Sequence, residues 1–143
     1  MSAKLKLFSA VIVFILLLTG YYCTSIQQHP TTHKLLVMQV NDEWKVVDAK
    51  DSTTTKIEVH AGDSIIWRLV GTDAYFQFND QIYDPATPAD SLSNGYTKFL
   101  SHAKVLHLKI KNDTPNGEYY YAVFCTAFGV FAQGDSPPKI IVN

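Results

Sequence analysis

The residue best suited to chemistry is Cys125, one of two cysteines and the only one in the part of the chain predicted to fold. A lone cysteine there forms no internal disulfide, so its thiol is buried, reactive or a metal ligand. A nucleophilic thiol needs a basic neighbour, and no residue adjacent to Cys125 is basic. The sequence also lacks a nucleophile elbow, a His-Glu-x-x-His motif and a phosphate-binding glycine-rich loop. We therefore expect that the protein is not an enzyme.

Period-two alternation from residue 35 onward predicts the strands that position this cysteine. Residues 35–40 and 43–47 flank the polar pair Asn41-Asp42, which is typical of a hairpin turn. Further strands are predicted at residues 56–60, 64–69, 75–78, 105–110 and 139–142. Residues 119–125 are apolar on both faces, as in a central strand covered on each side. Seven or eight short strands without a helix of normal length predict an all-β fold, an antiparallel sandwich.

Length and charge narrow the class of partner. At 143 residues, the chain is long enough for one domain with a sizeable core. Without Lys4 and Lys6, 10 of the 12 Lys and Arg residues stand against 13 Asp and Glu, so the net charge moves from −1 to −3. A mildly acidic domain lacks the basic surface that grips phosphate backbones. We therefore expect no nucleic-acid partner.

The N-terminus predicts export. Two lysines within the first six residues precede an apolar run at residues 7–19, which is the pattern of a secretory signal. Extended to Cys23, the run reaches about 17 residues, the lower limit for crossing a bilayer, so a cleaved signal and a retained membrane anchor both stay open. Cys23 adds lipidation as a third alternative, although the preceding Tyr22 is bulky. We expect residues 1–23 to be signal or anchor, residues 24–34 a polar tether, and residues 35–143 a domain facing the periplasm or exterior, or secreted.

Two segments resemble the cupredoxin family. The first, residues 57–67 (IEVHAGDSIIW), is similar to the family's strand, Gly-Asp turn, apolar pair and aromatic. The second runs from residue 116 through Cys125 to residue 142, and is similar to the Gly-x-Tyr strand that ends in the copper-ligating cysteine and precedes a final strand. The resemblance spans roughly residues 55–142. It implies a two-sheet Greek-key sandwich of the kind often used for electron transfer in the periplasm or at membrane surfaces.

The copper ligands that this resemblance implies are incomplete. A blue-copper centre needs one thiolate, two imidazoles and a weak axial ligand. In the family the histidines lie after the aromatic-bearing strand and shortly after the cysteine, but residues 70–77 and 126–133 contain none here. His102, in a predicted loop, and Gln133, as an axial amide, are the remaining candidates. We therefore expect no cofactor, with a copper site formed by Cys125, His102 and Gln133 as the alternative.

Aromatic residues fill the segments from which the imidazoles are missing. Phe128 and Phe131 follow Cys125, and three more come from the neighbouring strand region, namely Tyr75, Phe76 and Phe78. An exposed aromatic cluster suits a ligand or a protein partner. We therefore predict a non-catalytic domain that binds a small ligand or docks an unknown protein at this end, and that contacts the membrane through its N-terminal segment if that is retained. Copper-binding electron transfer or copper delivery is the alternative function.

Overall fold

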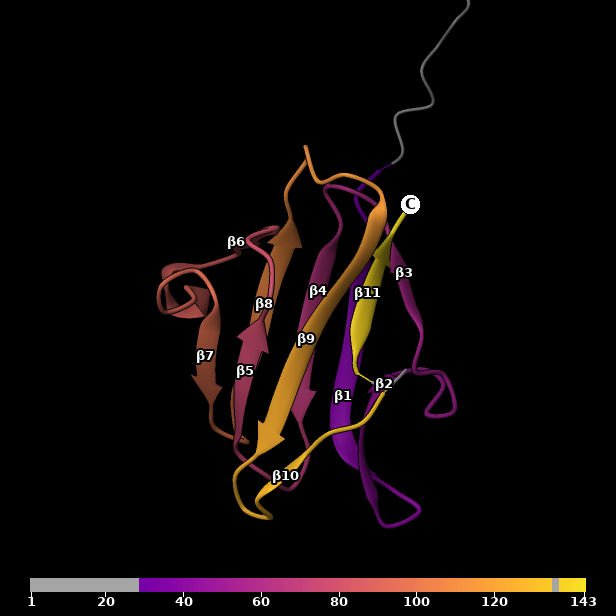
Figure 1. Cartoon of the computed structure of the whole chain (residues 1–143), viewed down its shortest axis with the longest axis vertical. Coiled ribbons are helices and arrows are strands. Elements are labelled where there is room, and N and C mark those ends of the chain that lie inside the picture. The colour runs from indigo at the N-terminus through magenta and orange to yellow at the C-terminus, as the bar shows by residue number, and fades with distance from the viewer. Residues whose placement is uncertain (1–28, 135–136) are drawn as a thin grey trace, which may run out of the picture.

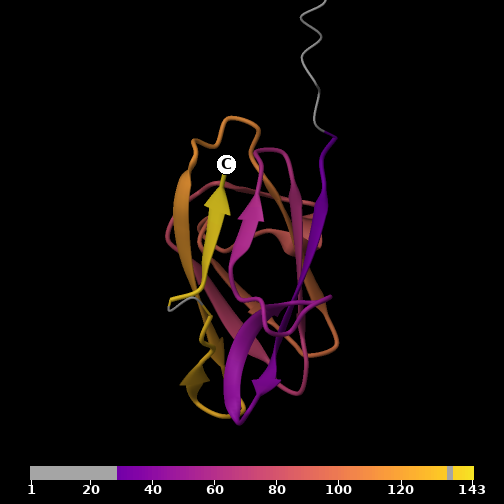
Figure 2. The same ribbon diagram turned by 90° about the vertical axis from the view of Figure 1, so that its right-hand side faces the viewer.

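The computed structural model describes residues 29–134 and 137–143, which form two β-sheets packed face to face (Figures 1 and 2). The first sheet has the order β2-β1-β4-β8-β6, with β1 Thr32–Val40, β2 Glu43–Asp48, β4 Ser64–Leu69, β6 Tyr83–Pro85 and β8 Val105–Ile110. The second has the order β3-β11-β9-β5-β7, with β3 Ile57–Val59, β5 Ala74–Phe78, β7 Thr97–Leu100, β9 Gly117–Cys125 and β11 Lys139–Val142, while β10 (Val130–Phe131) pairs with β9. A short 3-10 turn, η2 (Pro88–Asp90), lies between β6 and β7.

The predicted all-β Greek-key sandwich is confirmed, but its sheets are not purely antiparallel. β1 runs parallel to β4, and β11 runs parallel to β3, whereas the other pairs are antiparallel. The chain passes from the first sheet to the second between β2 and β3, and returns between β3 and β4. Because β1 and β4 meet through these crossings and not through a hairpin, they run in the same direction.

The N-terminal boundary of the domain also differs from the prediction. The polar segment at residues 24–34 was expected to be a tether, but β1 begins at Thr32 and pairs there with Ser64 of β4. A polar residue is tolerated at this position because Thr32 is exposed and precedes the part of β1 that pairs with β2. The predicted signal or anchor at residues 1–23, including Cys23, lies outside the described residues. Among the residues described, no helix is long and apolar enough to span a bilayer.

The core forms around Trp67, an inward-facing residue of β4. Its indole makes edge contacts with four aromatic rings of the facing layer and neighbouring strands, namely Phe76, Phe78, Tyr83 and Tyr121. Trp67 Nε1 donates to Tyr121 Oη at 3.3 Å, which satisfies a polar group that burial would otherwise leave without a partner. Burial raises the pKa of the Tyr121 phenol. The alternation predicted for β4 and β8 is confirmed, because their inward apolar residues have almost no exposed surface.

The Gly-Asp turn between β3 and β4 closes one end of the sandwich. Gly62 has φ +89°, a conformation that favours glycine, and a methyl group added there would also displace the Asn112 side chain, whose Oδ1 would lie 2.9 Å away. Asp63 is buried, and its carboxylate accepts from the N–H groups of Thr31 and His60 and from His33 Nε2. The turn therefore ties the start of β1 to the rest of the domain.

β9 lies at the centre of the second sheet, but only one of its faces is covered. The inner residues Tyr121, Val123 and Cys125 are buried, whereas Tyr120 and Phe124 on the other face keep accessible surface. The expectation of a strand covered on both sides is therefore wrong. The apolar outer face of β9 is open to solvent along the second sheet (Figure 1).

Candidate functional site

Cys125 is the last residue of β9, at the end of the sandwich opposite the Gly-Asp turn (Figure 1). It pairs with Ala74 of β5 on one side and with Val130 of β10 on the other. The N–H groups of Phe128 and Gly129 both donate to the Cys125 carbonyl, and Gly129 has φ +64°, so the connection to β10 is a tight hairpin. The side chain has no exposed surface, and burial raises the pKa of its thiol to about 11. This environment favours the neutral, unreactive thiol.

His102 lies at the same end of the sandwich, in the turn after β7. Its N–H and its Nδ1 both contact Asp73 Oδ1, at 2.8 and 3.0 Å. Both hydrogen bonds lower the pKa of the Asp73 carboxyl, and the one from the His102 N–H has the larger effect. The Asp73 carbonyl accepts from Thr126 N and Oγ1, which ties the hairpin after Cys125 to the same turn. His102 and Asp73 thus help to join the turn before β5, the turn after β7 and the hairpin after β9. The imidazole of His102 is 68% exposed.

Gln133 is held by its backbone. Its N–H donates to the Trp44 carbonyl at 2.7 Å, and its carbonyl accepts from Val46 N–H at 2.8 Å. Because Trp44 and Val46 belong to β2 of the first sheet, this short bridge closes the sandwich along one edge. The Gln133 residue is exposed, and its position is explained by these backbone hydrogen bonds between the two sheets.

The three proposed copper ligands lie in different surroundings. The Cys125 side chain is inaccessible, whereas the imidazole of His102 is in solvent and bonded to Asp73. Within residues 29–134 and 137–143, no three His, Cys, Asp or Glu side chains are grouped so as to hold a metal ion. A type 1 copper centre needs one thiolate and two imidazoles around one point, and the described residues hold no such group in this conformation.

An indole instead occupies the space between the two loops in which the resemblance placed the histidines. Trp44, from β2, packs on Phe128 of the Cys125 hairpin with ring centroids 5.0 Å apart. A methyl group added at Gly71, in the turn before β5, would lie 3.8 Å from the far edge of the Trp44 ring. Trp44 is only 7% exposed, and its Nε1 has no hydrogen-bond partner among the described residues. The aromatic packing of this end therefore depends on a residue that the sequence analysis did not single out.

The five predicted aromatic residues divide into two groups. Phe76 and Phe78 point inward and are core residues, with 0% and 1% exposure, so their assignment to a binding patch is wrong. Strand parity explains the correction, because alternate residues of β5 face opposite sides of the sheet. Tyr75, Phe128 and Phe131 are exposed, each by more than half.

The exposed members extend into a row that crosses four strands. Tyr75 of β5 faces Phe99 of β7 on one side and Phe124 of β9 on the other, and Phe124 faces Phe131 of β10. Ring centroids are 4.9 Å apart for Tyr75 and Phe99, and 5.1 Å apart for Phe124 and Phe131. We call Phe99, Tyr75, Phe124 and Phe131 the aromatic row. Phe99 and Phe124 were not predicted as site residues, although the alternation around Cys125 already places Phe124 on the outer face.

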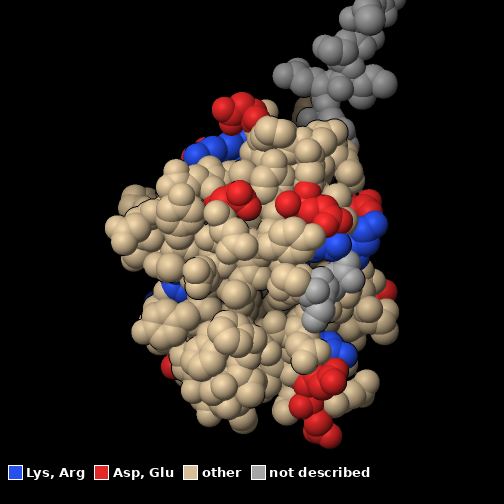
Figure 3. All heavy atoms as spheres, viewed as in Figure 1, with Lys and Arg blue, Asp and Glu red and all other residues tan. Residues whose placement is uncertain are grey.

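A hollow adjoins the aromatic row at Phe131. It has a volume of about 380 Å³, and Ala122, Gln133 and Pro138 are among the residues that line it. Figure 3 views this face of the molecule and shows few charged side chains over its lower part, where β9 ends, with acidic groups gathered at the lower right rim. An uncharged face that combines exposed aromatic rings with a neighbouring hollow has the features of a protein-binding surface.

Comparisons with known proteins find similarity in structure only. No family model matches the sequence, and no curated protein matches it. A copper(I) form of a glutamine-for-methionine variant of amicyanin is 11% identical over 78% of this chain and 82% of its own, with a TM-score of 0.41. A multicopper oxidase from Campylobacter jejuni is 12% identical over 83% of this chain and 27% of its own, with a TM-score of 0.44. A laccase from Pediococcus acidilactici is 14% identical over 83% of this chain and 28% of its own, with a TM-score of 0.37.

At these values the likeness says nothing about activity, and the present chain spans little more than a quarter of either oxidase. The fold class follows from the chain itself. It has two sheets in Greek-key order, the Gly-Asp turn, and a cysteine-ended strand followed by a loop and a final strand. The chain is therefore a cupredoxin-like β-sandwich.

Proposed function

We propose that this chain is a non-catalytic, extracytoplasmic domain that docks a protein partner through the aromatic row. The observation that carries the proposal is a run of four aromatic rings on the outer face of the second sheet, three of them exposed and Phe124 half-buried, held in register by β7, β5, β9 and β10. Tyr75, Phe99 and Phe131 are 54%, 48% and 63% exposed. Leaving this much aromatic surface in water costs free energy that binding a partner recovers.

The surrounding structure supports a docking role. Rigid strands carry the rings, so little conformational entropy is lost when a partner binds. The hollow beside Phe131 offers a place for a side chain of the partner, as in interfaces where one anchor residue fills a pocket. The partner that fits is a protein surface with an apolar, uncharged centre.

The location of the aromatic row agrees with an exported, tethered domain. His29, where the described chain begins, lies near the Gly-Asp turn, and the row lies toward the opposite end (Figure 1). A domain attached through its N-terminal segment would therefore present the row away from the attachment. Export itself rests on the apolar run at residues 7–19, which lies outside the described residues.

Site-specific photo-crosslinking of the full chain in its native cells tests the proposal. A photoreactive phenylalanine analogue replaces Tyr75 or Phe131, and the matched control carries it at Val105, an exposed residue on the other sheet. We expect the same cross-linked protein from both row positions and none from the control. Equal cross-linking at all three positions, or none, would contradict the proposal.

A copper titration tests the alternative function. Purified full-length protein is loaded with Cu(II), and its absorption is compared with that of the Cys125→Ser variant. We expect no strong thiolate-to-copper absorption, because the described residues hold no group of three His, Cys, Asp or Glu side chains for a metal ion and burial favours the neutral thiol. Stoichiometric copper with intense absorption that Cys125→Ser abolishes would establish a copper protein in place of the function proposed here.

A further inference from the structure

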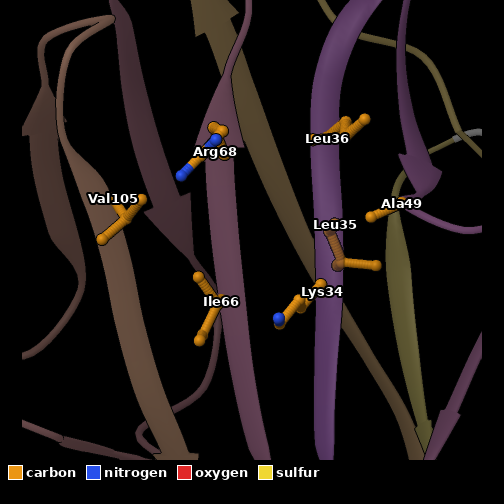
Figure 4. A pocket seen from close by; sticks show the side chains of 7 residues that line it. All are labelled: Lys34, Leu35, Leu36, Ala49, Ile66, Arg68 and Val105. Carbon is orange, nitrogen blue, oxygen red and sulfur yellow. The ribbon is translucent and has the colours of Figure 1, made fainter.

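The outer face of the first sheet, on the side of the molecule away from the aromatic row, carries a shallow groove of about 370 Å³ (Figure 4). Its lining includes Lys34 and Leu36 of β1, Ile66 and Arg68 of β4, and Val105 of β8. Ala49, which follows β2, closes one side, and its N–H donates to the Lys34 carbonyl. No other layer of the described chain covers this face (Figure 2).

Strand register places two cations around an apolar floor. Leu36, Arg68 and Val105 lie side by side in one row across β1, β4 and β8, and Lys34 lies beside Ile66 in the next row. In Figure 4 the nitrogen ends of Lys34 and Arg68 both lie over the part of the sheet that carries Ile66 and Val105. Each charged group thus borders aliphatic surface.

Neither of these cations has an acidic partner among the residues that the structure describes. Three other lysines of the domain form ion pairs, namely Lys45 with Glu43, Lys56 with Glu58, and Lys139 with Glu118. Within the described ranges no carboxylate lies at salt-bridge distance from Lys34 or Arg68, as is also true of several other lysines. What distinguishes Lys34 and Arg68 is that both border the apolar lining of one groove, in a domain that is acidic overall.

We propose that this groove binds a free single-chain amphiphile with one anionic head, such as a medium-chain carboxylate. The head lies between Lys34 and Arg68, where the guanidinium offers a two-pronged donor to a carboxylate. The tail lies on Leu36, Ile66 and Val105, which loses water from apolar surface on both sides. The volume is at the lower end of the range for small-molecule sites, which suits one chain. The site is a hollow and not a projecting apolar surface, so a single molecule fits it better than the surface of a bilayer.

Titration with decanoate and with decanol tests separately whether the groove binds the anionic head and whether it binds the apolar tail. The full-length chain, in zwitterionic nanodiscs, carries labelled methyl groups, and ligand concentrations are corrected for partition into empty nanodiscs. Decanoate should shift the methyl resonances of Leu36, Ile66 and Val105 in a saturable way. Lys34→Gln and Arg68→Gln should each weaken decanoate binding by about tenfold, as expected for the loss of one charge-assisted hydrogen bond, and leave the weaker binding of decanol unchanged.

Lys50→Gln provides the matched control, because Lys50 is an exposed cation next to Ala49 that does not line the groove. Its affinity for decanoate should equal that of the unmodified protein. The proposal would be overturned by equal affinity for decanol and decanoate, or by a loss of affinity in Lys50→Gln as large as in Arg68→Gln. It would also be overturned if the chain bound anionic vesicles or an acidic peptide without any response to decanoate. Resonance shifts caused by self-association of the chain would overturn it as well. None of these results bears on the aromatic row, because that surface belongs to the other sheet.

Discussion

The two ends of the sandwich use their buried side chains in opposite ways. At the Gly-Asp end, the carboxylate of Asp63 is buried and satisfied by three donors, the N–H groups of Thr31 and His60 and the imidazole of His33. At the other end, Cys125 is buried among apolar groups without a charged partner, and the Trp44 indole fills the space between the adjoining loops. One end is fixed by directional hydrogen bonds, and the other by packing.

This difference indicates which residue types the fold itself requires at each end. The Gly-Asp turn is needed to hold β1, β3 and β4 together, so its residue types are set by the fold. The Cys125 end is closed by a tight hairpin and by the bridge from Gln133 to β2, and neither requires a metal ligand. The fold of this end therefore depends on packing and backbone hydrogen bonds, and aromatic side chains are compatible with it.

Removing the packed indole should have the largest effect on stability. Trp44→Ala deletes a 93% buried ring and leaves a cavity next to Phe128, so we expect the free energy of unfolding to fall by about 4 kcal/mol. Chemical denaturation followed by circular dichroism measures this change. Phe128→Ala is the matched variant and should cost much less, because Phe128 is 54% exposed. Equal losses in the two variants would show that the indole does not hold this end together.

Removing the polar anchor at the other end should have the next largest effect. Asp63→Ala leaves the N–H groups of Thr31 and His60 without acceptors, and we expect a loss of about 3 kcal/mol at neutral pH. Asp51→Asn is the control, because Asp51 also accepts from neighbouring threonines but lies in an exposed turn, so we expect little change. Similar effects of the two substitutions would contradict the importance of burial at Asp63.

The Asp63 carboxylate should also make the free energy of unfolding depend on pH. Burial acts to raise the pKa of Asp63, but hydrogen bonds from the N–H groups of Thr31 and His60, and from His33, outweigh it, so the pKa lies below its ordinary value. A lowered pKa means that the stabilisation is present above the unfolded-state value of about 3.9 and is lost as the pH falls through the folded-state value. Unfolding free energies measured from pH 6 down to pH 2 should therefore fall less steeply for Asp63→Ala than for the unmodified chain. Parallel curves would contradict this assignment.

Local sequence patterns predicted short-range features better than contacts between distant segments. The Asn41-Asp42 hairpin, the Gly-Asp turn and the inward faces of β4 and β8 each depend on neighbouring residues, and all three are confirmed. The separation of Tyr75 from Phe76 and Phe78 was also readable from strand parity, although the prediction grouped them. The contact of Trp44 with Phe128 and the neighbouring positions of Phe99 and Tyr75 join strands that are distant in sequence or too short for a pattern. Such pairings are decided by the topology of both sheets, which no single segment contains.

The thiol offers a smaller test of the packed end. Because the pKa of Cys125 is raised to about 11 by burial, only about one thiol in ten thousand is ionised at pH 7. In a Cys23→Ser background, which leaves Cys125 as the single thiol, Ellman's reagent should therefore react slowly with the folded chain and rapidly once denaturant is added. Cys125→Ser should cost about 1–2 kcal/mol, because it buries a hydroxyl among apolar groups. Rapid labelling of the folded chain would indicate a reactive thiol and would remove the contrast between the two ends.

The smallest effect on stability is expected from the surface that we propose as functional. Phe131→Ser and Tyr75→Ser remove rings that are 63% and 54% exposed, so each should change the free energy of unfolding by about 0.5 kcal/mol or less. Phe76→Ser, on the inner face of the same strand as Tyr75, is the matched control and should be strongly destabilising, because its ring is fully buried. Denaturation curves of the three variants measure the contrast. If the Tyr75 and Phe131 variants keep their stability but lose the photo-crosslinked partner, the aromatic row contributes to binding and not to folding. A loss of stability in Phe131→Ser as large as in Phe76→Ser would instead make the row part of the packed end, and its exposure would need another explanation.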